Sequence, residues 1–299
     1  MQMRRLFTIL CTLAALVTVA GQTPSPYGPT GAEGEPNREQ RWLVPTTDGD
    51  RPARAALFRP QGEGPFRLAL VAHATTQDVL RRAQMPQPEY RALAAFLVAS
   101  GFAVLVPERL RHGATGGAYL EDQGGCDEAD YARSGRATAE QIIQALDYMP
   151  GRPFIRRDGA TILGHSAGAW GALALAGEDP KSISTIVLFG PGRVGHANGF
   201  ENRICAPHTL MAAARAFGSG ARVPVSWLVA ANDTYFSPDF SRKLAEAFRS
   251  GGGTAAFVVL PASGSEGRWL AETETGVRLA APALDRALKR ADGSTTKNR

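Results

Sequence analysis

The feature that most constrains this chain is the pentapeptide Gly164-His165-Ser166-Ala167-Gly168. The apolar run 160–163 before it is typical of a buried strand, and residues 169–176 after it are typical of a helix. A strand, a G-x-S-x-G turn and a helix in this order form a nucleophile elbow, which raises a serine hydroxyl above a sheet. A side chain at either outer glycine would collide with the strand or the helix. The pattern therefore predicts Ser166 as a nucleophile, and the alternative is a glycine-rich turn with an incidental serine.

The rest of the chain alternates strand-like and helix-like segments. We expect strands at 42–45, 55–58, 66–73, 102–106, 160–163, 184–189, 224–230 and 255–260, and helices at 88–100, 134–149, 169–176, 237–248 and 276–289. The first two strands read as an antiparallel hairpin at the sheet edge. Such alternation predicts an α/β fold with a mostly parallel central sheet and helices on both faces. Residues 190–220 are the longest stretch that does not follow this alternation, and they are predicted to form a small cap.

The two ends of the chain differ from its middle. Arg4 and Arg5 followed by the apolar run 6–20 are typical of a secretory signal peptide, so residues 1–20 are expected to be removed on export to the periplasm or the medium. An uncleaved membrane anchor is the alternative. Residues 21–40 are expected to be a flexible leader, 41–290 the folded domain and 291–299 a polar tail. No membrane span is expected after cleavage of the signal peptide.

Composition restricts the partners. The 299 residues carry a formal net charge of +5, and arginine and lysine form no stripe interleaved with aromatic residues. Binding to nucleic acid is therefore not expected, and a basic solvated surface is the simpler reading. We expect a small-molecule substrate, with no metal and no cofactor; the oligomeric state is left open.

The cysteines bear on the compartment. Of the three, Cys11 lies in the predicted signal peptide, which leaves Cys126 and Cys205 in the mature chain. Export to an oxidising compartment favours a disulfide between them, and two unpaired thiols are the alternative.

Two further features follow strands of the predicted sheet, whose carboxyl ends are where ligands bind. Asp233 comes directly after the strand 224–230, where a carboxylate can orient an imidazole and stabilise its cation. Ala74, or Thr75, follows the strand 66–73, and its backbone N–H together with that of Ala167 would form an oxyanion hole.

With these positions in place, the chain resembles the α/β-hydrolases of the dienelactone hydrolase type, in particular exported bacterial members. The resemblance spans most of the domain and is carried by His73-Ala74, 107–117, Cys126, 164–170, 190–193, Asn202, Cys205, 227–236 and 261–270. The segment Trp-x-x-x-x-Asn-Asp-x-Tyr-Phe at 227–236 is more specific than the elbow. The resemblance implies an esterase or lactonase that works through an acyl-serine intermediate.

The chain departs from that family at the base. Relatives carry a histidine after the last strand, whereas this chain has Arg268 there and no histidine after His208. A guanidinium is always charged and accepts no proton, so Arg268 is not a base. Ala74 also stands where relatives have glycine. Another histidine could serve as the base, the candidates being His73, His112, His165, His196 and His208.

Two functions of different class remain open. The first is a serine hydrolase of small carboxylic esters or lactones, impaired by the missing histidine. The second is a pseudoenzyme that keeps the fold as a ligand-binding or partner-binding module. A transferase or peroxidase variant is a weaker third reading. In either main case, we expect Arg268 to pair with Asp233 and to hold this carboxylate away from Ser166.

Overall fold

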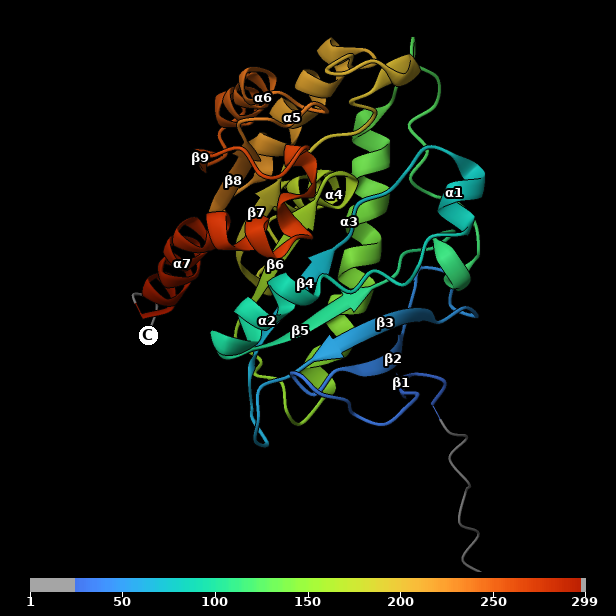
Figure 1. Ribbon diagram of the computed structural model, residues 1–299, viewed down its shortest axis with the longest axis vertical. Coiled ribbons are helices and arrows are strands. Elements are labelled where there is room, and N and C mark those ends of the chain that lie inside the picture. Colours follow the sequence, from blue (N-terminus) through green and yellow to red (C-terminus); the bar gives the residue numbers. More distant parts are fainter. Residues whose placement is uncertain (1–24, 297–299) are drawn as a thin grey trace, which may run out of the picture.

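The computed structural model describes residues 25–296 of the chain, with side chains to residue 290. A single sheet runs through the molecule in the order β1-β2-β3-β5-β4-β6-β7-β8-β9 (Figure 1). The predicted signal peptide lies outside the described residues. The strands are β1 (Gly28–Pro29), β2 (Gln40–Val44), β3 (Ala53–Phe58), β4 (Arg67–Ala72), β5 (Phe102–Pro107), β6 (Ala160–His165), β7 (Ile183–Phe189), β8 (Val225–Ala230) and β9 (Ala255–Leu260).

The direction of the strands confirms the mostly parallel sheet. β1, β2 and β3 are antiparallel at one edge, and β3 pairs with β5 in the antiparallel sense. From β5 through β4, β6, β7, β8 and β9, all neighbours are parallel. Every residue of β5, β6 and β8 is buried, as expected for strands covered on both faces. The carboxyl ends of β4, β6, β7 and β8 therefore lie side by side at one edge of the sheet.

Helices cover both faces of the sheet. The longer ones are α2 (Arg91–Ala99), α3 (Tyr131–Tyr148), α4 (Ala167–Gly177), α5 (Pro207–Gly220), α6 (Pro238–Ser250) and α7 (Glu274–Thr296). The helices α3, α4, α5 and α6 pack on one face, while α2 and α7 pack together on the other (Figure 1). Each face has its own apolar core, with Trp170 and Trp227 on the first and Phe189 on the second. The predicted Ser237 cap is present, since its Oγ accepts a hydrogen bond from Phe240 N at 3.3 Å.

Two described segments, 25–40 and 291–296, contain regular structure where we expected a flexible leader and a polar tail. Residues Gly28 and Pro29, in the predicted flexible leader, form β1 and pair with Leu43 and Trp42 of β2. At the other end, α7 continues to Thr296, through most of the predicted polar tail. Pairing with β2 orders Gly28 and Pro29 although their surroundings are polar and rich in glycine and proline. The polar residues after 290 are helical because they continue α7.

The predicted cap is smaller than expected. Its second half is α5, which packs against α4 and α6 within the layer of helices that covers the sheet. Of residues 190–220, the part before α5 is the one that lies over the strand ends beside Ser166. The predicted disulfide between Cys126 and Cys205 is present, and it ties this segment to the chain that precedes α3.

Among residues 25–296, no helix combines the length and the apolar character that crossing a membrane requires.

Candidate active site

Ser166 stands at the turn between β6 and α4 in a strained backbone conformation, with φ of 58° and ψ of −119°. This is the conformation of a nucleophile elbow. A Cβ on Gly164 would overlap the backbone of Ala169, and one on Gly168 would overlap the carbonyl of Ala72 at the end of β4. The two glycines are therefore required sterically, as predicted from the sequence.

Asp233 follows β8, beside the elbow. It is 4% exposed, and its Oδ1 accepts hydrogen bonds from Tyr235 N at 2.8 Å and Phe236 N at 2.9 Å. Burial raises the pKa of the Asp233 carboxyl, and the nearby Arg268 charge opposes that rise. With Oδ1 engaged by the backbone, Oδ2 is the oxygen available to a neighbouring side chain.

Arg268 occupies the place between Ser166 and Asp233. Its Nη2 donates a hydrogen bond to Ser166 Oγ, and its Nη1 donates to Gly190 O at 3.1 Å. Its guanidinium carbon also lies 4.8 Å from the centre of the Tyr235 ring. Within the described part of the chain, Arg268 makes no ion pair with Asp233. The expected contact of guanidinium with carboxylate is therefore replaced by a contact with the nucleophile itself.

The loop that carries Arg268 is tied to the loop that carries Asp233. Glu266 accepts hydrogen bonds from Thr234 N and from Arg268 N, at 3.2 and 2.8 Å. Gly267 N donates to Asn232 O at 3.2 Å, and a Cβ on Gly267 would lie 2.6 Å from Ala230 Cβ. These contacts fix the position of residue 268 relative to the end of β8.

His165 lies inside the elbow and points away from the cavity that Ser166 faces. It is 1% exposed, its Nε2 donates to Arg268 O at 2.8 Å, and its Nδ1 lies 2.9 Å from Tyr90 Oη and 3.1 Å from Glu272 Oε1. His165 therefore holds the loop of Arg268 in place through its hydrogen bond to the Arg268 carbonyl. Sequence reasoning missed Tyr90 and Glu272, because nothing in their local patterns links them to residue 165.

One of the two predicted oxyanion donors, the backbone N–H of Ala74, already has a hydrogen-bond partner. Ala74 N donates a hydrogen bond to Tyr90 Oη at 3.0 Å, so this N–H is already engaged. Thr75 lines the cavity beside Ser166, and Ala167 begins α4 at the elbow. The sequence left Ala74 and Thr75 as alternatives for this donor. In the described chain the N–H of Thr75 has no hydrogen bond of this kind, so Thr75 is the better placed of the two.

None of the five histidines, all of which lie in the described residues, hydrogen-bonds Ser166. Burial lowers the pKa of His73 well below its ordinary value and that of His112 to about 4, and the two rings pack edge to face. His208 is exposed. His196 lines the same cavity as Ser166, where its ring stacks on Tyr235 and its Nε2 lies 2.9 Å from Thr234 O. It is the one histidine placed to approach the site.

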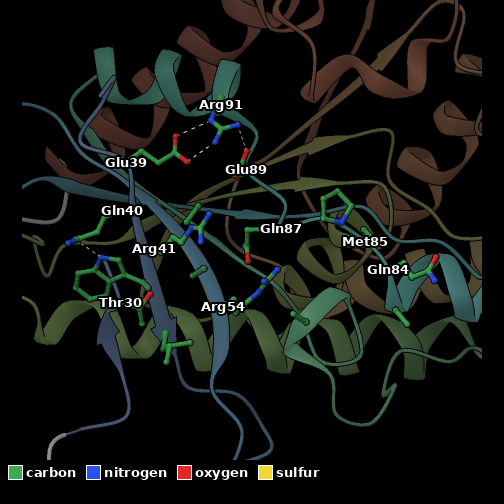
Figure 2. A pocket seen from close by; sticks show the side chains of 17 residues that line it. Thr30, Glu39, Gln40, Arg41, Arg54, Gln84, Met85, Gln87, Glu89 and Arg91 are labelled. Carbon is green, nitrogen blue, oxygen red and sulfur yellow. Dashed lines mark hydrogen bonds and ion pairs between the residues drawn. The ribbon is translucent and has the colours of Figure 1, made fainter. Parts of the chain in front are cut away.

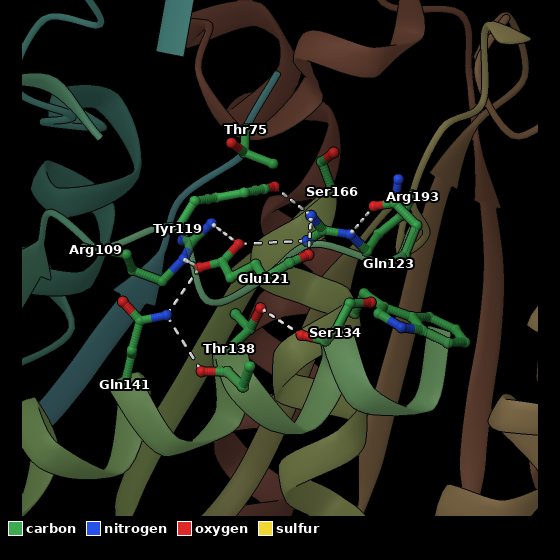
Figure 3. A network of polar contacts seen from close by, with 12 residues as sticks. Thr75, Arg109, Tyr119, Glu121, Gln123, Ser134, Thr138, Gln141, Ser166 and Arg193 are labelled. Atoms are coloured by element: carbon green, nitrogen blue, oxygen red, sulfur yellow. Dashed lines mark hydrogen bonds and ion pairs between the residues drawn. The ribbon is translucent and has the colours of Figure 1, made fainter. Parts of the chain in front are cut away.

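A buried polar network lies below the cavity (Figure 3). At its centre Glu121, 0% exposed, binds both Arg109 and Arg193. Arg109 and Arg193 hold the pKa of the Glu121 carboxyl far below its ordinary value against the opposing effect of burial. Arg193 also donates to Tyr119 Oη at 2.6 Å, and Gln141 donates to Glu121 at 3.1 Å. The network fixes the segment 107–123 and the loop after β7 to α3, under Ser166.

The cavity above Ser166 has a volume of about 660 Å³. Its wall includes the stacked His196 and Tyr235, the half-exposed Trp269 and the disulfide. A second cavity of about 690 Å³ lies between β2, β3 and the chain before α2, where Arg91 pairs with Glu39 and Glu89 (Figure 2). Its lining includes no histidine and no serine. Within the described residues, no group of histidine, cysteine and carboxylate side chains could hold a metal ion.

No family model matches this chain, and no curated protein matches it. Solved structures do. An esterase from Pyrococcus furiosus is 14% identical with a TM-score of 0.57, the alignment covering 84% of this chain and 92% of the esterase. A protein from Klebsiella pneumoniae assigned to the dienelactone hydrolases is 17% identical with a TM-score of 0.54. The alignment covers 85% of this chain and 98% of the Klebsiella protein. The dipeptidyl peptidase 4 of Porphyromonas gingivalis is 13% identical with a TM-score of 0.57, covering 85% of this chain and 36% of that longer one.

At these identities, the similarity establishes the fold. Together with the sheet order and the elbow, it shows that this chain has the α/β-hydrolase fold, as expected from the sequence.

Proposed function

We propose that this protein is a serine hydrolase of small carboxylic esters or lactones, with turnover far below that of enzymes with a complete triad. The observation that carries the proposal is Ser166, held in the strained elbow conformation at the floor of a cavity of about 660 Å³. Backbone strain of this kind persists only where the surrounding structure maintains it, and it is found at functional sites. The fold shared with esterases supports the same class.

The slow turnover follows from the contacts of Ser166. Attack on an ester carbonyl requires the hydroxyl to lose its proton, and Arg268 donates to Oγ instead of accepting from it. What remains is positioning and the N–H donors of the elbow, which in enzymes stripped of triad residues leave ~10³–10⁴-fold acceleration over water. The disulfide further supports the proposal that the chain is exported to an oxidising compartment.

The second candidate is a ligand-binding pseudoenzyme. The observation that favours it is that a guanidinium, and no imidazole, contacts the serine. In that case the cavity binds a ligand without transforming it.

Labelling with a fluorophosphonate probe distinguishes the serine hydrolase from the ligand-binding pseudoenzyme. The full chain, its Ser166→Ala variant and its His196→Gln variant are incubated with the probe, and labelling is followed by intact mass. The hydrolase proposal predicts slow labelling of the parent that Ser166→Ala abolishes. Loss of labelling in His196→Gln would identify that histidine as a displaced base. A parent chain that stays unlabelled would reject the hydrolase and leave the pseudoenzyme.

A further inference from the structure

The starting observation is a buried positive charge at the bottom of the Ser166 cavity. Arg268 is 7% exposed, and the nearby Asp233 carboxylate favours its charge, although none of the ion pairs of the described chain joins these two side chains. Its hydrogen-bond acceptors are a hydroxyl and a carbonyl, Ser166 Oγ and Gly190 O, which are both neutral. A charge removed from water is costly unless an opposite charge compensates it.

Asp233 supplies part of that compensation, and the other buried charges around the cavity are mainly arginines. Arg193, which also lines the cavity, and Arg109 share one carboxylate, Glu121. Arg82 is 4% exposed, stacks its guanidinium 3.5 Å above the Tyr119 ring and donates to Thr76 O at 2.9 Å. Around Ser166, the buried guanidinium groups of Arg82, Arg109, Arg193 and Arg268 therefore stand against the buried carboxylates of Glu121 and Asp233, while the buried Glu108 pairs with Arg54. The partly exposed Glu266 and Glu272 bind Thr234 and His165, and the exposed Asp78 lines the cavity paired with Arg81.

A neutral hydrogen-bond donor, the Ala167 N–H, lies near the guanidinium. Ala167 is the first residue of α4, a helix of 11 residues, so its N–H lies at the positive end of the helix dipole. Because Ala167 follows Ser166 directly, this N–H and the Arg268 guanidinium both lie beside the serine hydroxyl. Such an arrangement of one cation and backbone N–H groups suits a planar anion.

The upper wall of the cavity has a different chemistry. The rings of His196 and Tyr235 stack with centroids 3.6 Å apart, and Trp269 is 44% exposed beside them. Val194 and Ala197 add apolar surface to the wall. A ligand whose one end is anionic and whose body is apolar would match both regions, within a volume of about 660 Å³.

We propose that the Ser166 cavity binds a small monocarboxylate with an aromatic or aliphatic body, its carboxylate held by the Arg268 guanidinium and the Ala167 N–H. The inference rests on the proposed function in that an acid of this class is what hydrolysis of a small ester would release. It makes Arg268 a ligand-binding residue, and it predicts that the acid is retained in the site.

Calorimetric titration of the purified full chain with phenylacetate tests this proposal, and phenylacetamide is the uncharged control of the same shape. Phenylacetate is expected to bind at least tenfold more tightly than phenylacetamide, because hydrogen bonds to charged groups contribute ~1.5–3 kcal/mol, or about 10–150-fold. Arg268→Gln, which keeps hydrogen-bond donors but loses the charge, should remove this preference. Arg203→Gln removes one exposed charge of the segment 190–206 outside the cavity and should leave the preference intact.

The parent chain tests the proposal by itself: equal affinity for phenylacetate and phenylacetamide, or no binding of either, would overturn it. Retention of the preference in a folded Arg268→Gln variant would also overturn it. If Arg268→Gln does not fold, Arg268→Lys keeps a charge and should retain a weaker preference for the acid.

Ser166→Ala separates this inference from the proposed hydrolysis. The substitution abolishes probe labelling, but it frees Arg268 Nη2 and should leave phenylacetate binding unchanged or tighter. Carboxylate binding without labelling of the parent would reject the hydrolase alone, whereas labelling without carboxylate preference would reject this inference alone.

Discussion

Replacing Arg268 with histidine is expected to give Ser166 the base that it lacks. In the structure the side chain of residue 268 already reaches Ser166 Oγ, and the oxygen Asp233 Oδ2 lies close to the same place. A Cβ placed on Gly190 would lie 2.8 Å from Asp233 Oδ2 and 3.5 Å from Arg268 Nη1, so these two atoms flank one glycine. An imidazole at residue 268 could therefore donate to Oδ2 and accept the proton of Ser166.

The expected gain is large because the base is the missing component. Loss of the base from a complete triad costs ~10⁴–10⁶-fold in kcat. Histidine is shorter than arginine, and Glu266 and Asn232 hold the loop of residue 268 in place, so only part of this factor is expected. We expect at least about 10²-fold, equivalent to about 2.7 kcal/mol of transition-state stabilisation. The substitution also leaves Gly190 O without its donor, at a cost of about 1–3 kcal/mol in stability.

The assay is the kcat/KM for p-nitrophenyl acetate of the parent, Arg268→His, and Arg268→His combined with Ser166→Ala or with Asp233→Asn. The gain should disappear with Ser166→Ala and fall sharply with Asp233→Asn. Arg268→Gln controls for mere removal of the charge and should gain little. A folded Arg268→His variant that shows no serine-dependent gain would refute the reasoning that residue 268 stands at the place of the base.

Three further outcomes follow from the contacts around the site. Glu121→Ala leaves Arg109 and Arg193 buried without their carboxylate and should lower the free energy of unfolding by ~3–5 kcal/mol in urea denaturation; an unchanged midpoint would show that water replaces the carboxylate. Reduction of the disulfide, or Cys126→Ser with Cys205→Ser, opens a loop of 79 residues and should cost up to about 4.5 kcal/mol, whereas alkylatable thiols in the unreduced, denatured chain would contradict the pairing. Burial holds the pKa of His112 at about 4, so the unfolded chain binds its proton first and about 3 kcal/mol of stability should be lost as pH falls from about 6.5 to 4. His112→Asn should remove this contribution and leave that of the buried His73, whose pKa is also lowered; an unaltered pH profile would show that His112 contributes nothing.

The sequence by itself determined the features that depend on neighbours along the chain. Gly164 and Gly168 around Ser166 indicate an elbow because the steric conflict they avoid is local, and the structure shows that conflict directly. Apolar runs bounded by turns indicated the strands of the parallel sheet, and Ser237 indicated the start of α6. The place of Asp233 followed from the rule that parallel strands bring their carboxyl ends together.

Contacts between distant parts of the chain were decided by the tertiary structure alone. The resemblance read from the sequence suggested Arg268 as the residue at the position of the family's base and Asp233 as its partner, whereas the fold gives the guanidinium to Ser166 and Gly190. Tyr90 meets His165 and the amide of Ala74 although it is remote from both in sequence. Composition likewise suggested a detached leader, yet Gly28 and Pro29 pair with β2. In each case a side chain or an edge has several chemically acceptable partners, and only packing of the whole sheet and its helices selects which one lies within hydrogen-bonding distance.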